Sequence, residues 1–147
     1  MNKRTLIRFI AASLVGIVAA TSALAQAKLD KASQPAKLVI QVSDAEPAKW
    51  NLALNNAKNV QEELGAKNVE IEIVAYGPGI GMLKKDAITS DRVDEATMAG
   101  IKVVACENTI RNLKLTRADI HSAASYANSG VVEIMQKQKA GWAYVRP

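Results

Sequence analysis

Cysteine and histidine are each present only once in this 147-residue chain, as Cys106 and His121. A single cysteine cannot form a disulfide within the chain, so packing alone must hold the fold together. The single histidine has no acid or cysteine beside it at metal-ligand spacing, and no local signature of a Ser/His/Asp or Cys/His arrangement accompanies it. We therefore assign no metal and no cofactor from the sequence.

Aromatic residues are also scarce, at 4% of the chain, and no dense run of lysine and arginine is interleaved with them. A basic surface with aromatic stacking residues is the usual footprint of nucleic-acid binding. The formal net charge of +5 comes partly from Lys3, Arg4 and Arg8 at the N-terminus. Without these three, 16 basic residues face 14 acidic ones, a net charge of +2. Nucleic acid is therefore not an expected partner.

The N-terminal segment has the organisation of a secretory signal peptide. Its basic residues are followed by an apolar run over residues 9–20 and by the small-x-small motif Ala23-Leu24-Ala25. The apolar run is too short to span a bilayer as a helix, and no second run follows it. We predict that residues 1–25 are removed and that the mature protein is periplasmic, with no membrane attachment.

The mature chain has the length of one domain. Residues 26–36 are polar with a proline, which is typical of a flexible leader, and residues 37–147 form the single predicted domain.

Apolar runs of strand type alternate with segments of helical periodicity along that domain. The expected strands are residues 38–42, 69–76, 101–106 and 142–145. The expected helices are a segment that begins within 43–47 and ends at 64, then 91–99, 107–115 and 131–138. Short helical turns are expected at 80–85 and from 116–119, and a loop over 122–130. Ser43 or Asp44 is expected to cap the first helix.

This alternation predicts an α/β fold: a three-layer α/β/α sandwich around a mostly parallel sheet of about four to five strands. In open sheets of this kind the ligand site lies beyond the carboxyl ends of the strands. Loops 43–47, 77–81 and 106–109 follow three of the expected strands, so we predict that they lie close together.

Cys106 stands where a buried strand runs directly into the first turn of a helix. Helix N-termini present unpaired N–H groups and the positive end of the macrodipole, and both favour the nucleophilic thiolate. Free cysteine is also among the most buried residue types, so a packed core residue is the alternative interpretation.

Residues beside Cys106 and in the glycine-rich loop are the supporting candidates. Glu107 fits complementation of a helix dipole but disfavours a second negative charge next to it. Asn108 and Thr109 are of helix-capping type and are candidates for contact with the sulfur. Gly77 and Gly79 match neither the dinucleotide fingerprint nor a Walker loop, which favours a tight turn over an anion cradle.

Five segments together resemble the DsrE/DsrF-like family, and the likeness covers the chain from about Lys37 to Pro147. They are Lys37-Leu38-Val39-Ile40-Gln41-Val42, the Asn-rich segment 50–57, the loop Ala75-Tyr76-Gly77-Pro78-Gly79-Ile80, Val104-Ala105-Cys106-Glu107-Asn108-Thr109, and Gly130-Val131-Val132-Glu133. The resemblance is strongest to exported bacterial members. It implies a three-layer α/β/α fold and ring-like trimers or hexamers.

In its sulfur-relay branch the family also implies a cysteine that carries sulfur as a persulfide, and Cys106 occupies the matching position. Tyr76 belongs to the glycine-loop segment that carries the resemblance. One thiol is enough for a carrier, because the second thiol can belong to a partner. The resulting hypothesis is a periplasmic homo-oligomer in which Cys106 transfers sulfane sulfur or acts as a redox thiol, as a carrier rather than a turnover enzyme. The alternative is a non-catalytic α/β binding or assembly module.

Overall fold

A computed structural model describes residues 34–147. The predicted signal peptide, residues 1–25, and most of the predicted leader, residues 26–36, lie outside the described residues. No helix among residues 34–147 has the length and apolar character needed to cross a membrane.

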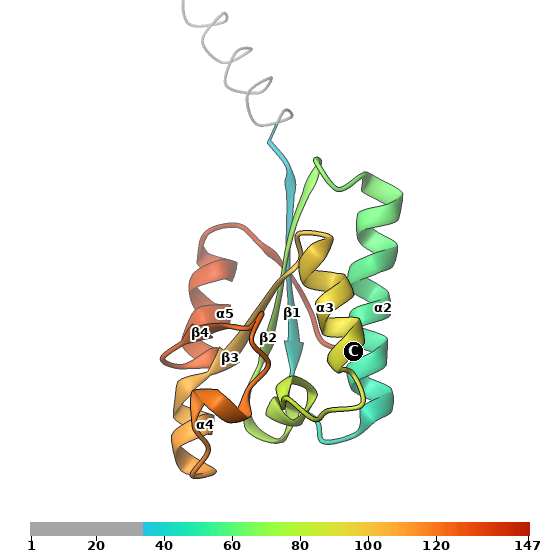
Figure 1. The fold of residues 1–147 in the computed structure, drawn as a ribbon. Helices are drawn as coiled ribbons and strands as arrows, with labels where there is room; N and C mark the ends of the chain where they lie inside the picture. The colour runs from blue at the N-terminus through green and yellow to red at the C-terminus, as the bar shows by residue number, and fades with distance from the viewer. Residues whose placement is uncertain (1–33) are drawn as a thin grey trace, which may run out of the picture. The chain divides into compact units, whose positions relative to one another are not determined.

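Strands and helices alternate along the chain as the hydrophobic pattern predicts (Figure 1). The strands are β1 (Ala36–Val42), β2 (Val69–Ala75), β3 (Lys102–Cys106), β4 (Ser125–Ala127) and β5 (Ala143–Val145). The α-helices are α2 (Pro47–Leu64), α3 (Ser90–Met98), α4 (Glu107–Asn112) and α5 (Gly130–Lys139). Two 3₁₀ helices, η1 (Gly77–Leu83) and η2 (Arg117–Asp119), complete the elements of the described residues.

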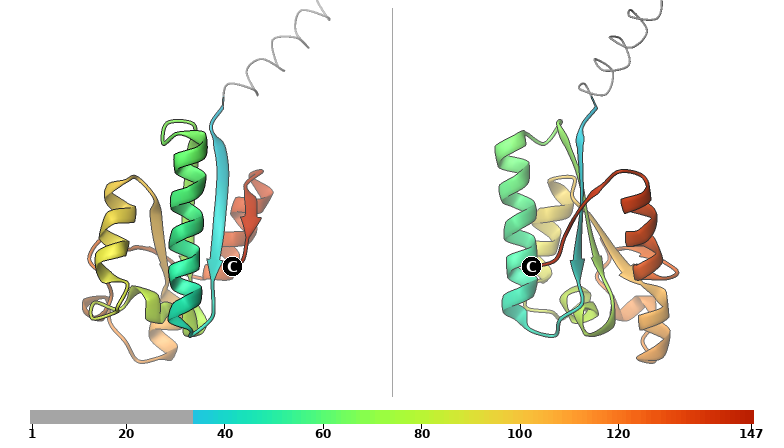
Figure 2. Two further views of the ribbon diagram at one scale, coloured as in Figure 1. Left: turned by 90° about the vertical axis from the view of Figure 1, so that its right-hand side faces the viewer. Right: turned by 180° about the vertical axis from the view of Figure 1, so that it is seen from behind.

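The five strands form one parallel sheet in the order β4-β3-β2-β1-β5. The chain moves from β1 to β4 in one direction and then returns across the sheet to place β5 beside β1. Because crossovers are right-handed, a reversal of direction moves the connecting helix to the opposite face. Accordingly α2 and α3 lie on one face and α5 lies on the other (Figure 2). The predicted α/β/α class with four to five strands is confirmed.

The two faces of the sheet differ in how much apolar surface they bury. The face under α2 and α3 belongs to a cluster of 21 buried residues, which includes Ile40, Ile73 and Val103. The α5 face has a cluster of four buried residues: Val39, Val74, Val104 and Ile134. Alternate residues of each strand serve the two faces, as the pleat requires.

Glycines follow the ends of three helices. Gly65, Gly100 and Gly141 follow α2, α3 and α5 with φ of 84°, 87° and 85°, a conformation that costs glycine little. The turn predicted at 116–119 is η2, closed by a reciprocal capping box between Thr116 and Asp119.

Two local expectations were wrong. Segment 122–130 is not all loop, because Ser125–Ala127 pairs with β3 as the edge strand β4. The N-cap of α2 is Glu46, without a side-chain cap, rather than Ser43 or Asp44. Pro47 follows as the first helical residue, a position whose N–H has no partner within the helix, so its missing N–H costs little there.

Candidate functional site

The loops that follow β1, β2 and β3 meet at the carboxyl edge of the sheet, as predicted. The N–H of Tyr76 donates to the carbonyl of Val42 at 3.1 Å. A Cβ on Gly79 would lie 2.2 Å from the same carbonyl oxygen, so only glycine fits against that backbone. The N–H of Gly77 donates to Thr109 Oγ1 at 2.9 Å, which joins the second loop to the start of α4.

Cys106 lies at this edge as the last residue of β3 and the residue before α4. Its side chain shares the face of Val104 and points toward α5 rather than toward α2 and α3. Its Sγ accepts a hydrogen bond from the N–H of Gly130, the first residue of α5, at 3.2 Å. The residue is only 4% exposed. The thiol is therefore covered, with the N-termini of two helices beside it.

Hydrogen bonds decide the acidity of this thiol. Burial alone would raise the pKa of Cys106, because it disfavours the charged form. The Thr109 hydroxyl and the backbone N–H groups of Gly130, Thr109 and Asn108 oppose burial and together hold the pKa below its ordinary value of 9.0. The balance makes the thiolate more populated than in a free cysteine, as expected where two helix starts converge.

Gly130 is a site residue that sequence reasoning did not single out for the chemistry. A Cβ at this position would lie 3.0 Å from Tyr76 Cβ and 3.3 Å from Cys106 Cβ. Glycine thus lets the first turn of α5 approach the sheet closely enough for its N–H to reach the sulfur. The signal in the sequence was a glycine at a helix start directly after a small, polar segment.

Thr109 links the thiol to the glycine loop. It is buried at 9% exposure, accepts the Gly77 N–H, and helps to lower the pKa of Cys106 through its hydroxyl. Gly77 has a φ of 53°, a left-handed conformation that glycine adopts without strain. Of the residues predicted from sequence, Thr109, Gly77 and Tyr76 therefore gather with Cys106.

The side chains of Glu107 and Asn108 are engaged elsewhere. The Glu107 carboxylate accepts a hydrogen bond from Arg117, whose guanidinium lies over the Tyr126 ring at 4.3 Å. Arg111 donates to the Asn108 side-chain oxygen. The Glu107 charge is thus compensated by an arginine, which reduces its repulsion of a thiolate at Cys106.

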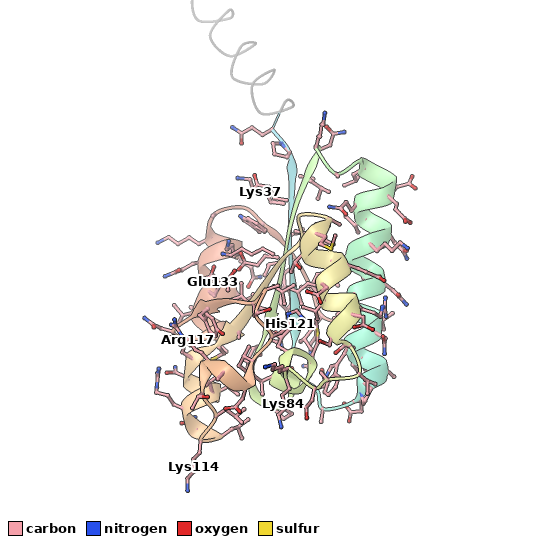
Figure 3. All side chains as sticks on the ribbon, viewed as in Figure 1. Lys37, Lys84, Lys114, Arg117, His121 and Glu133 are labelled. Carbon is pink, nitrogen blue, oxygen red and sulfur yellow. The ribbon has the colours of Figure 1, made fainter. Side chains whose placement is uncertain are left out.

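The remaining candidate groups do not form a metal site. No cluster of three or more His, Cys, Asp or Glu side chains suited to a metal occurs within residues 34–147. His121 is buried, with its Nε2 atom 3.5 Å from a carboxylate oxygen of Asp94 on α3. Lys114, which follows α4, points away from the molecule (Figure 3).

Comparisons with known proteins agree with this architecture. The model of the DsrE/DsrF-like family matches residues 36–147. A solved protein of unknown function from Methanobacterium thermoautotrophicum is 32% identical with a TM-score of 0.73, covering 76% of this chain and 99% of its own. A second, from Bacteroides thetaiotaomicron, is 17% identical with a TM-score of 0.57, covering 76% of this chain and 94% of its own, and shows the shared fold. No curated protein matches the chain.

Proposed function

Because this chain belongs to the DsrE/DsrF-like family, we propose that it is a sulfur-handling protein in which Cys106 carries sulfur as a persulfide. One observation carries the proposal: Sγ of Cys106 receives the N–H of Gly130 at the junction of two helix starts. Groups that stabilise a thiolate also stabilise the terminal sulfur of a persulfide anion, which bears the same charge one atom further out.

The chemistry needs no redox partner. The Cys106 thiolate attacks the sulfane sulfur of a thiosulfonate, and a new S–S bond forms as the S–S bond of the donor breaks. The electron pair of the broken bond leaves on the sulfinate. The two reactants, the thiolate and the thiosulfonate anion, each carry one negative charge, and so do the two products, the persulfide anion and the sulfinate. A thiolate on a partner then attacks the outer sulfur and releases the Cys106 thiolate.

Each half of this cycle requires access to a covered sulfur. Because Cys106 is only 4% exposed, a donor reaches it only when neighbouring elements move apart locally. The neighbours that must move are the first turn of α5 and the adjoining segment from Asn128 to Gly130. The α5 helix is held to the sheet by the smaller apolar cluster, which favours this opening over one on the opposite face.

The same burial supports a second candidate function. In that account the protein is a non-catalytic α/β binding or assembly module, and Cys106 is a small core residue satisfied by a backbone N–H. The two accounts differ in whether the folded thiol reacts.

Reaction of the folded protein with a small alkylating reagent, followed over pH, separates them. A carrier gives modification in buffer, with an apparent pKa below 9.0. A packed core residue gives modification only in denaturant. Serine at position 106 is the blank for both conditions, since it removes the only thiol of the chain.

The setting proposed for this chemistry is the periplasm, reached through the N-terminal signal peptide. We also propose that the protein acts as a homo-oligomer, a trimer or a hexamer, with a thiol-bearing or sulfane-sulfur partner. Exposed apolar side chains on α5 support an additional protein contact on this face.

A further inference from the structure

The α5 helix meets the sheet through three residues in one row. Gly130, Ile134 and Lys137 are spaced four and three residues apart, which places them on a single face of the helix. Gly130 contacts Cys106, Ile134 packs in the cluster with Val74, and Lys137 pairs with a carboxylate on β2. The row therefore runs from the carboxyl edge of the sheet toward its amino edge.

The carboxylate at the far end of this row belongs to Glu72. The residue has no exposed surface, although it lies in the middle of a strand. Its Oε2 atom receives Lys137 Nζ at 2.7 Å and lies 3.2 Å from Lys102 Nζ. Its Oε1 atom is buried without a hydrogen-bond partner. A buried carboxylate of this kind is costly unless its cationic partners stay in place.

Lys137 also has two close neighbours besides Glu72. Its Nζ lies 3.5 Å from Glu133 one turn earlier on α5 and 4.3 Å from the centre of the Trp142 ring. Glu133 is marked on this helix in Figure 3. Burial would lower the pKa of Lys137, but the ion pair with Glu72 outweighs it and raises the pKa, so the ammonium stays charged.

The ion pair of Glu72 and Lys137 matters on this face because few apolar residues hold α5 to the sheet. Four buried residues form the α5 cluster, against 21 in the cluster on the other face. Lys137 lies seven residues from Gly130, about 10 Å along the helix at 1.5 Å per residue. A slide of α5 by a fraction of a turn would break the contact at Glu72 and the N–H···S contact at Cys106 together.

We propose that the ion pair of Glu72 and Lys137 is a positioning device that sets the register of α5 on the sheet and so keeps the Gly130 N–H on Cys106 Sγ. Glu72 is a positioning residue, since it acts through the helix and does not touch the sulfur. The inference deepens the proposed function. It rests on that function only for the reason why the pKa of Cys106 is lowered, not for the coupling of Glu72 to the thiol.

The pKa of Cys106 in the Glu72→Gln variant tests the proposal, read from the thiolate absorbance of the only cysteine. Loss of a negative charge, acting through space alone, would stabilise the thiolate and lower this pKa. Loss of register weakens the Gly130 hydrogen bond and raises it. We expect a rise of about half a unit or more, so the sign distinguishes positioning from simple electrostatics.

Glu70→Gln is the matched control. Glu70 lies two residues earlier on the same strand and face, but it is exposed and its contact with Lys37 is a 3.7 Å surface pair. It should leave the Cys106 pKa within about 0.2 units of wild type. An unchanged or lowered pKa in Glu72→Gln would overturn the proposal, as would an equal rise in both variants.

A double-mutant cycle with Gly130→Ala shows whether the effect passes through the helix start. Once the alanine has displaced the N–H, Glu72→Gln should raise the Cys106 pKa no further. Additive shifts would contradict positioning. If Glu72→Gln does not fold, Lys137→Met replaces it in the cycle with the same expected non-additivity.

The proposed function fails on a different observation. A wild-type protein that takes up no sulfur at Cys106 overturns the carrier role, whereas the pKa cycle reads the coupling of Glu72 to the thiol whether or not sulfur is carried.

Discussion

The N–H of Gly130 donates to Sγ of Cys106 at 3.2 Å, between residues that lie 24 positions apart in the sequence. This contact joins the end of β3 to the start of α5, two elements that are not consecutive in the sequence. It accounts for the lowered pKa of Cys106 together with the donors at the start of α4. The first prediction follows from it.

Gly130→Ala should raise the pKa of Cys106 and destabilise the fold. The new Cβ would lie 3.0 Å from Tyr76 Cβ, so α5 must shift away and the N–H···S bond lengthens. Overpacking of this kind costs about 1–3 kcal/mol in the free energy of unfolding. Thiolate absorbance gives the pKa and urea denaturation gives the stability.

Gly100→Ala is the control for that experiment. Gly100 has open space around it but a φ of 87°, so alanine there costs about 1–2 kcal/mol through backbone strain alone. Its effect on the Cys106 pKa should be absent. An equal rise of the pKa in both variants would show that general destabilisation, not the Gly130 contact, controls the thiol.

The stability contributed by Cys106 should depend on pH. The folded-state pKa lies below the ordinary value of 9.0, so the unfolded state binds more protons between the two values. The contribution is therefore complete above 9.0 and is lost as the pH falls through the folded-state pKa. The difference in unfolding free energy between wild type and Cys106→Ser should grow from neutral pH toward 9.0, measured by urea denaturation. A difference that is flat over this range would contradict thiolate stabilisation.

Substitution on the exposed face of α5 should disrupt the proposed homo-oligomer. Met135 is 62% exposed, and Val131 and Val132 are each 48% exposed, which together form an apolar strip. Met135→Lys should shift light scattering from a trimer or hexamer toward monomer. Met98→Lys is the control, since Met98 is 88% exposed on α3, which covers the other face. A wild type that is monomeric at micromolar concentration would refute the assembly.

Export should give a shortened mature chain. N-terminal sequencing of periplasmic protein should begin at Gln26 or Lys28, because the motif Ala23-Leu24-Ala25 is followed by a second small-x-small site two residues later. Full-length protein recovered from the cytoplasm would contradict this expectation.

The parts of the fold predicted from sequence are those with long apolar runs. β1 and β3 are mostly apolar along their length, and β2 alternates glutamate with apolar residues before an apolar end, so all three were recognisable as strands. β4 was missed because Ser125–Ala127 has only three residues, all of them half-buried. A strand this short carries no periodicity, and its pairing with β3 is decided by tertiary packing.

Only those residues of the candidate site that are close to Cys106 in the sequence were predictable. Cys106 and Thr109 belong to one strand-to-helix junction, so their proximity follows from a few residues of sequence. Gly130 contributes a backbone N–H, a group that every residue except proline has, so residue type did not reveal its role. Glu72 looked like the polar half of an alternating strand, and only the packing of α5 over it shows that it is buried.

Mass spectrometry of the folded protein after treatment with a thiosulfonate donor tests the central claim most directly. The account predicts one added sulfur atom on the peptide that contains Cys106, removed again by a small thiol, and no addition to Cys106→Ser. Wild-type protein that gains no sulfur while folded, but reacts after denaturation, would contradict the carrier function and leave Cys106 as a packed core residue.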